Sequence, residues 1–256
     1  MSTATTPGRL QGKRAIVTGA AGALGRVIAE TLAKEGADVA GLDLNGAGLE
    51  DTAALVRSHG VRALSATADL TDFDAVQNAV AGIIVEWGGV DILLNGAGGG
   101  AVKYFHEMTP EIWQVQLDRN LTSVFNVTRA VLPSMIDQHF GRIINIASIA
   151  AVSGGRLVRG ATAYAAAKAG VVGLTKALAI EVAENGITVN ALAPGAQATP
   201  GRDNDTPERR EALLDQIPTR LLGEPEHLAQ TVVFLAAPES VNITGVILPL
   251  DGGHSI

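Results

Sequence analysis

The chain has no cysteine and few aromatic residues, and what it lacks excludes several classes of function. Without cysteine it forms no disulfide, carries no thiol nucleophile and holds no cysteine-ligated metal. Its formal net charge is −7 at pH 7, and lysine and arginine form no basic run along it. Nucleic acids and anionic membrane surfaces bind basic patches, so we expect neither as the main partner.

Long apolar segments are also missing. No stretch approaches the roughly 18 apolar residues that cross a bilayer. Residues 1–8 are small and polar and lack the charged and apolar pattern of a signal peptide. We therefore expect a soluble, cytoplasmic protein with a flexible start at residues 1–8. The five histidines are scattered without ligand spacing, so no metal site is predicted.

Short apolar runs alternate with longer segments of helical pattern through most of the 256 residues. The apolar runs are continuous, as is typical of parallel strands in a sheet that helices cover on both faces. The sequence therefore predicts a single α/β domain over residues 1–256, with a doubly wound (Rossmann) parallel sheet. Strands are expected at residues 13–18, 37–43, 61–66, 90–95, 141–147, 187–192 and 246–250, and helices at 23–35, 47–59, 71–87, 110–139, 163–184 and 225–236.

Two segments near the end of the chain refine this prediction. Pro249 lies inside the last predicted strand, and because proline cannot donate to a ladder, that strand is expected at an edge. Residues 194–224 begin at a predicted strand end and are rich in turn-forming residues. Ligands of open α/β sheets bind beyond the carboxyl ends of the strands, so we interpret 194–224 as a substrate lid.

A glycine-rich loop at residues 18–25 joins the first predicted strand to the first helix. Glycines there let the backbone approach a pyrophosphate, whose charge the helix N-terminus stabilises. Asp43 ends the second predicted strand, where a carboxylate accepts hydrogen bonds from a ribose 2′-hydroxyl and repels a 2′-phosphate. No lysine or arginine lies beside it in residues 42–45. The sequence therefore predicts a dinucleotide site that prefers NAD to NADP.

Tyr164 and Lys168 are four residues apart in a predicted helix, so their side chains share one face. A phenol with a pKa of roughly 10 is a poor base at neutral pH. A nearby ammonium favours the phenolate and lowers that pKa. The pair therefore predicts a tyrosine that transfers protons.

Together these features resemble the short-chain dehydrogenase/reductase family along nearly the whole chain. The resemblance rests on the order and spacing of short motifs. They are the loop at 18–25, Asp69-Leu70, Asn95-Gly96-Ala97-Gly98, Asn120, Ser148, Tyr164 with Lys168, Pro194-Gly195 and Asp251-Gly252-Gly253. The resemblance implies an oxidoreductase that uses a nicotinamide dinucleotide on a small-molecule substrate and assembles as a homotetramer.

The resemblance also implies a role for each motif. Tyr164 would be the general acid/base, and Lys168 would lower its pKa and hydrogen-bond the nicotinamide ribose. Ser148 would hold the substrate oxygen, and Asn120 would anchor a water on the proton path. No metal is required, since the cofactor would carry the hydride. The expected cofactor-binding residues are Gly19, Gly22, Ala23, Leu24, Gly25, Asp43, Leu44, Asp69, Leu70, Asn95, Gly96, Ala97, Tyr164, Lys168, Pro194, Gly195 and Thr199; Asp69 as a helix cap stays open.

The chain departs from the family pattern in three places. Ala23 replaces the middle glycine of the loop, so the helix start must accommodate a methyl group. Asn95-Gly96 replaces paired asparagines, which removes one polar side chain near the cofactor. The Ser148 to Tyr164 separation is longer than is common, which enlarges the loop at 153–160. None of these changes removes a catalytic group, and the third bears on the substrate.

Three arginines fall on segments expected to border the substrate. Arg156 and Arg159 lie in the enlarged loop and Arg202 in the lid, and guanidinium groups suit carboxylate, sulfonate or phosphate recognition. Solvated loop charges are the alternative.

The leading hypothesis is an NAD-dependent dehydrogenase of a secondary alcohol, polyol, sugar-like compound or hydroxy acid.

Two other functions stay open. One is a biosynthetic carbonyl reductase of the 3-oxoacyl thioester type, against whose usual NADP preference Asp43 counts. The other is a non-catalytic dinucleotide sensor, against which the presence of both Tyr164 and Lys168 counts.

The helix predicted at 163–184 is apolar nearly all round, so its outer face is expected to contact another subunit beside the helix at 110–139.

Overall fold

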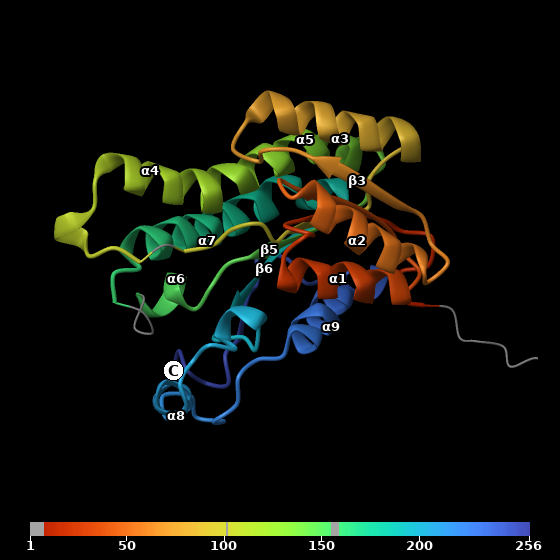
Figure 1. Ribbon diagram of the computed structural model, residues 1–256. Coiled ribbons are helices and arrows are strands. Elements are labelled where there is room, and N and C mark those ends of the chain that lie inside the picture. Colours follow the sequence, from red (N-terminus) through yellow and green to blue (C-terminus); the bar gives the residue numbers. More distant parts are fainter. Residues whose placement is uncertain (1–7, 101, 155–158) are drawn as a thin grey trace, which may run out of the picture.

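In the computed structural model, which describes residues 8–100, 102–154 and 159–256, parallel strands form one seven-stranded sheet (Figure 1). Its order, β3-β2-β1-β4-β5-β6-β7, confirms the predicted doubly wound fold. It also places the strand that contains Pro249 at an edge, as predicted. The strands are β1 (Arg14–Thr18), β2 (Asp38–Asp43), β3 (Ala63–Thr67), β4 (Ile92–Asn95), β5 (Gly141–Ile146), β6 (Ile187–Pro194) and β7 (Ile247–Leu250).

Helices cover both faces of the sheet. Figure 1 shows α1 and α9 on one side and α3 and α5 on the other, and the two apolar cores follow the same division. None of the described helices is both long enough and apolar enough to cross a membrane. The helices are α1 (Ala23–Lys34), α2 (Gly46–Arg57), α3 (Phe73–Trp87), α4 (Pro110–Leu117), α5 (Ser123–Asp137), α6 (Ala150–Ser153), α7 (Thr162–Val182), α8 (Pro207–Leu214) and α9 (Pro225–Ala236).

The continuous apolar strands are explained by these two cores. In β1, Ala15 and Val17 enter the core under α1 and α9, whereas Ile16 between them enters the core under α3 and α5. All three side chains are fully buried. Because successive strand residues point to opposite faces, the centre of a strand buried on both sides is apolar at consecutive positions.

The predicted helix at 110–139 differs from the structure. A π turn, η2 (Asp118–Thr122), separates α4 from α5, and it buries Asn120 completely. A π turn adds one residue to the helical repeat, so the side chains that follow it change direction. The side chains of α5 therefore point in other directions than they would if α4 continued without the turn.

The predicted lid, residues 194–224, leaves the sheet after β6 and carries η4 (Pro200–Arg202) and α8. Two backbone hydrogen bonds close its base, from Ala198 N to Gly223 O at 2.8 Å and from Gly223 N to Ala196 O at 2.9 Å. No residue of α8 is buried. The lid is therefore fixed at its base and exposed at its tip.

Candidate active site

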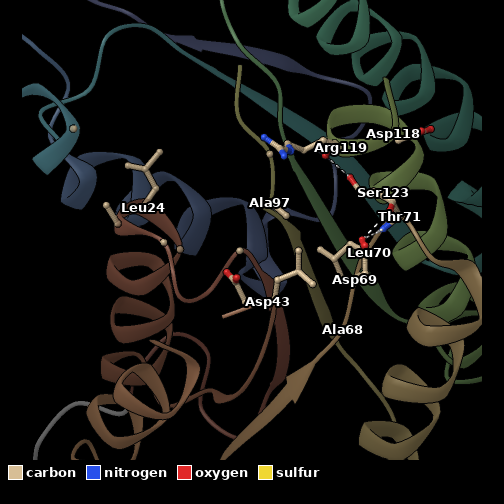
Figure 2. Close-up of a pocket in the computed structure, with 18 of the residues that line it drawn as sticks. Leu24, Asp43, Ala68, Asp69, Leu70, Thr71, Ala97, Asp118, Arg119 and Ser123 are labelled. Carbon is tan, nitrogen blue, oxygen red and sulfur yellow. Dashed lines mark hydrogen bonds between the residues drawn. The ribbon is translucent and has the colours of Figure 1, made fainter. Parts of the chain in front are cut away.

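A pocket of about 700 Å³ lies beyond the carboxyl ends of β1, β2, β3 and β4 (Figure 2). This size suits a small-molecule ligand. The loops after these strands supply most of the lining, and the η2 region and the lid complete it. Of the residues expected at a cofactor, the lining includes Gly19, Gly22, Ala23, Leu24, Gly25, Asp43, Leu44, Asp69, Leu70, Gly96, Ala97 and Thr199.

The loop between β1 and α1 needs glycine where the chain is closely packed. A Cβ on Gly25 would lie 2.1 Å from the carbonyl oxygen of Gly19, and one on Gly19 would lie 2.9 Å from Ala97 Cα. No side chain caps the start of α1 at Gly22, so its first amide groups are available to an anion. The methyl group of Ala23 is exposed, so this departure from the family pattern costs no packing.

The Asp43 carboxylate is half-buried and tied to the glycine loop. Its Oδ2 accepts a hydrogen bond from Ala21 N at 3.1 Å, and its Oδ1 accepts one from Asn45 N at 3.0 Å. Asn45 also caps α2 through Gly48 N. These bonds fix the carboxylate against the pocket, where it presents negative charge to whatever binds there.

Asp69 lines the pocket beyond β3. Its Oδ1 accepts hydrogen bonds from Thr71 N at 2.9 Å and Thr71 Oγ1 at 2.7 Å. These bonds, with the charge of Arg119, lower the pKa of Asp69. It is Asp72, not Asp69, whose side chain caps α3. Asp69 is thus a carboxylate held at the pocket wall.

Thr18 connects two loops of the pocket. Its Oγ1 accepts hydrogen bonds from Gly96 N at 3.0 Å and Ala97 N at 3.1 Å and donates to Leu94 O at 3.3 Å. A Cβ on Gly96 would lie 2.9 Å from the Thr18 carbonyl oxygen. The backbone of Thr18 therefore leaves no room for a side chain at position 96, where the family pattern has its second asparagine.

Asn95 does not line the pocket, contrary to expectation. It is buried, and its Nδ2 donates to Thr128 Oγ1 at 3.0 Å and to Asn145 Oδ1 at 2.8 Å. Asn145 Nδ2 in turn donates to Thr175 Oγ1 at 2.9 Å. This buried chain joins α5 through β4 and β5 to α7. Asn95 therefore holds the framework of the site in position.

Pro194 and Gly195 also lie outside the pocket lining. The Pro194 carbonyl accepts a hydrogen bond from Ile149 N at 3.2 Å, and Gly195 N donates to Leu250 O at 3.0 Å. A Cβ on Gly195 would lie 2.9 Å from Asp251 Cα. Both residues therefore contact neighbouring chain segments at the base of the lid. Thr199, which follows them in the chain, lines the pocket.

Ser148, Tyr164 and Lys168 come together where β5 ends and α7 begins. Lys168 is buried, and its Nζ donates to the carbonyl oxygen of Ile146 at 2.7 Å. Burial lowers the pKa of Lys168 from 10.5 to about 8. Its Nζ lies 5.9 Å from the centre of the Tyr164 ring.

The expected lowering of the Tyr164 pKa is wrong for this structure. Burial of the phenol raises its pKa, and the hydrogen bond with Ser148 opposes that shift. The Lys168 ammonium donates to the Ile146 carbonyl, and it does not lower the pKa of Tyr164. The structure thus favours the neutral phenol of Tyr164.

Asn120 clamps the loop that separates the pocket from these catalytic candidates. Its Oδ1 accepts from Gly99 N at 3.0 Å, and its Nδ2 donates to Gly99 O and Gln116 O, both at 3.0 Å. A Cβ on Gly98 would lie 3.4 Å from Lys168 Nζ, and one on Gly100 would lie 3.3 Å from the Tyr164 ring. The catalytic candidates therefore border residues 98–100, at the end of the pocket.

The three arginines proposed for substrate recognition are less well placed. Arg156 lies outside the described residues. Arg159 is exposed and does not line the pocket. Arg202 forms an ion pair with Asp205 at 3.2 Å, which offsets its charge within the lid.

The arginine that does line the pocket is Arg119, which sequence reasoning missed. It precedes Asn120 in the π turn, and helical periodicity gives no signal for such an insertion. Its neighbours Val115, Asp118 and Ser123 were missed for the same reason. Gly98, the last residue of the motif that begins at Asn95, lines the pocket as expected, and the other unpredicted lining residues are Ala68, Thr71, Pro200 and Gly201.

Comparison with known proteins gives matches over almost the whole chain. The short chain dehydrogenase family matches residues 13–210. A 3-oxoacyl-[acyl-carrier-protein] reductase of Vibrio cholerae is 40% identical over 244 residues, covering 95% of this chain and 98% of that protein. A (2S)-[(R)-hydroxy(phenyl)methyl]succinyl-CoA dehydrogenase subunit of Thauera aromatica is 38% identical, covering 96% of this chain and 98% of that protein. The solved structure of a putative gluconate dehydrogenase from Agrobacterium tumefaciens superposes with a TM-score of 0.89 at 35% identity, covering 96% of this chain and 97% of that one.

Proposed function

Because the chain belongs to the short-chain dehydrogenase family, we propose that it is an oxidoreductase that interconverts a 3-oxoacyl thioester and the matching 3-hydroxyacyl thioester. The observation that carries the chemistry is the meeting of Ser148, Tyr164 and Lys168 behind residues 98–100 at the end of the pocket. The names of the Vibrio cholerae and Thauera aromatica relatives, both acting on acyl thioesters, support the substrate class. They favour this reading over a polyol or simple alcohol.

We propose NAD as the cofactor. A Cβ on Gly19 or Gly25 would clash with neighbouring backbone, so the tight turn of this loop needs glycine at both positions. Such a turn lets backbone amides approach a pyrophosphate. Asp43 would accept hydrogen bonds from the adenosine ribose, and its fixed charge disfavours a 2′-phosphate. Thr199 and Lys168 would hold the nicotinamide half. Bound NAD would supply the hydride chemistry that the side chains of this pocket lack.

In the reducing direction, the hydroxyl groups of Ser148 and Tyr164 both donate to the substrate carbonyl oxygen. Polarisation and proton delivery then act on one atom. The raised pKa of Tyr164 keeps its phenol protonated at neutral pH, which suits a proton donor. Lys168, whose Nζ lies 5.9 Å from the centre of the Tyr164 ring, would leave a positive charge within reach of the phenolate that remains, without a direct hydrogen bond to it.

The test is a panel of substrates assayed with NADH and with NADPH, following the absorbance of the reduced cofactor. We expect acetoacetyl-CoA with NADH to give the highest kcat/KM. Failure of every 3-oxoacyl thioester, with turnover of a polyol or hydroxy acid, would overturn the substrate class. A higher kcat/KM for NADPH would overturn the cofactor alone.

A second candidate is oxidation of an anionic hydroxy acid. The likeness to a putative gluconate dehydrogenase and the arginines of the substrate side favour it. Arg202 already pairs with Asp205, however, and Arg159 lies away from the pocket lining. The same panel, read in the oxidising direction with gluconate and NAD, decides between the two.

We further propose a cytoplasmic homotetramer. The outer face of α7 presents small residues, Ala169, Gly173 and Ala177, which are exposed in the isolated chain. Phe125 on neighbouring α5 is half exposed. Such a face suits close packing of a second subunit. Light scattering at micromolar concentration tests the assembly, and a monomer there would exclude it.

A further inference from the structure

Arg119 occupies a position in the pocket that the proposed reaction does not yet use. It lies in the π turn η2, where Asn120 is buried against Gly99 and Arg119 faces the opposite way into the pocket. Figure 2 shows its guanidinium extending from the helix toward the middle of the pocket, near Ala97 and across from Leu24 of the glycine loop. Consecutive side chains of a helix point in different directions, so these two neighbours reach different parts of the site.

The carboxylates of Asp118 and Asp69 in the lining accept hydrogen bonds from other donors, and Arg119 acts on Asp69 only through its charge, which lowers the pKa of Asp69. Asp118 Oδ1 accepts hydrogen bonds from Gln114 Nε2 at 2.9 Å and Thr122 Oγ1 at 3.1 Å. Asp69 Oδ1 accepts from both the amide and the hydroxyl of Thr71. Within the described part of the chain, the Arg119 guanidinium forms no ion pair and donates no hydrogen bond. Its N–H donors remain available to a ligand.

The charge of the pocket makes this cation significant. Asp43, Asp69 and Asp118 place three carboxylates in its wall, whereas Arg119 is the one lysine or arginine in the described lining. A dinucleotide brings a further negative pyrophosphate. The glycine loop offers that group backbone amides at the start of α1 but no charge. A cation on the facing wall would offset repulsion from the carboxylates and complete the clamp.

We propose that Arg119 binds the pyrophosphate of the dinucleotide from the wall opposite the glycine loop. This inference rests on the proposed dinucleotide-dependent function and adds a specific contact to it. An arginine in this place binds phosphate oxygens through two parallel N–H donors, which a lysine cannot reproduce. The affinity for the diphosphate part of the cofactor should therefore depend on Arg119, and the affinity for adenosine should not.

Calorimetric titration of the purified Arg119→Gln variant tests the contact with NADH, ADP-ribose and adenosine as separate probes. Loss of a charge-assisted bidentate contact should weaken NADH and ADP-ribose binding by about tenfold or more. Adenosine affinity should stay as in the wild type, and Arg119→Lys should retain part of the affinity. Arg129→Gln on α5 makes the same charge change at an exposed position outside the pocket and should bind all three probes normally.

Ionic strength provides a second readout. Added KCl should weaken ADP-ribose binding to the wild type more steeply than to Arg119→Gln, since the variant lacks the charge that salt screens. Unchanged ADP-ribose affinity in Arg119→Gln overturns the proposal. An equal loss for adenosine also overturns it, because the guanidinium would then stack on adenine. In a further titration with 2′,5′-ADP, a loss confined to that probe would place Arg119 at a 2′-phosphate and overturn the proposal too. Absence of NADH and ADP-ribose binding to the wild type would instead refute the proposed function itself.

Discussion

Lys168 Nζ donates a hydrogen bond to the carbonyl oxygen of Ile146 at 2.7 Å, which joins the first half of α7 to the end of β5. Asn145, one residue earlier, makes a second link to α7 through Thr175. These two links fix the Lys168 ammonium in its buried position between α7 and β5. It is also desolvated, which is why its pKa falls to about 8.

That burial predicts a pH-dependent stability. Between pH 8 and 10.5 the unfolded state binds a proton at Lys168 that the native state does not, so stability rises with pH across this window. Below pH 8 both states are protonated and the penalty is constant. Relative to a Lys168→Met variant, the protein should gain on the order of 3 kcal/mol between pH 7 and pH 11. Urea denaturation at several pH values measures the difference.

Because the pKa of Tyr164 is raised in the folded protein, this residue makes the free energy of unfolding fall as the pH rises, opposite to Lys168. The effect of Lys168 is therefore best measured in variants that lack the Tyr164 phenol. The pair to compare is Tyr164→Phe and Tyr164→Phe/Lys168→Met. If the two free energies of unfolding run parallel from pH 7 to pH 11, Lys168 is not the desolvated group described above.

Replacing Asp43 with Asn should shift cofactor preference toward NADPH. The amide keeps an oxygen that can accept from Ala21 N or Asn45 N but removes the charge that repels a 2′-phosphate. The ratio of kcat/KM for NADPH to that for NADH should rise by at least about tenfold. Asp137→Asn removes one charge at an exposed site on α5 and should leave the ratio unaltered.

Two glycine substitutions should have opposite effects on stability. Gly25→Ala would place a methyl group 2.1 Å from the Gly19 carbonyl oxygen, so the loop must move, at a cost of about 1–3 kcal/mol or more. Gly82→Ala adds a methyl group with nothing within 4 Å, on exposed α3, and should stabilise by about 0.5–1 kcal/mol. Thermal unfolding of both variants checks the contrast. A stable Gly25→Ala protein would show that the loop has a different conformation.

Asn120→Ala should impair both stability and turnover. It leaves the Gly99 N–H and C=O without their partner, which costs about 1–3 kcal/mol. It also releases residues 98–100, which lie against Lys168 and Tyr164. Denaturation and steady-state kinetics measure the two effects. Exposed Asn78→Ala on α3 serves as the control, and equal behaviour of the two variants would contradict the clamp.

The sheet and most of its helices were predictable because their pattern is local. A strand such as β1, buried on both faces, carries three consecutive apolar residues at its centre, and this is visible in the residues themselves. The π turn that contains Asn120 was not predictable, because no residue type marks a one-residue insertion, and within one long apolar segment the insertion appears only as a shift in the phase of the pattern. Arg119 was missed for this reason.

Site chemistry was predictable where spacing decides it and not where burial does. The four-residue separation of Tyr164 and Lys168 correctly placed both side chains on one helix face. It could not show that Lys168 Nζ turns to Ile146, nor that burial raises the Tyr164 pKa. Likewise the motif around Asn95 indicated a loop at the cofactor, but the side chain itself points into a buried network with Thr128 and Asn145.

In the proposed function, Tyr164 transfers the proton in a reaction that consumes NADH. The most direct measurement compares wild type and Tyr164→Phe in two assays, titration with NADH and oxidation of NADH by acetoacetyl-CoA. Both proteins should bind NADH with similar affinity, and only the wild type should turn over. Turnover by Tyr164→Phe at the wild-type rate would contradict the account.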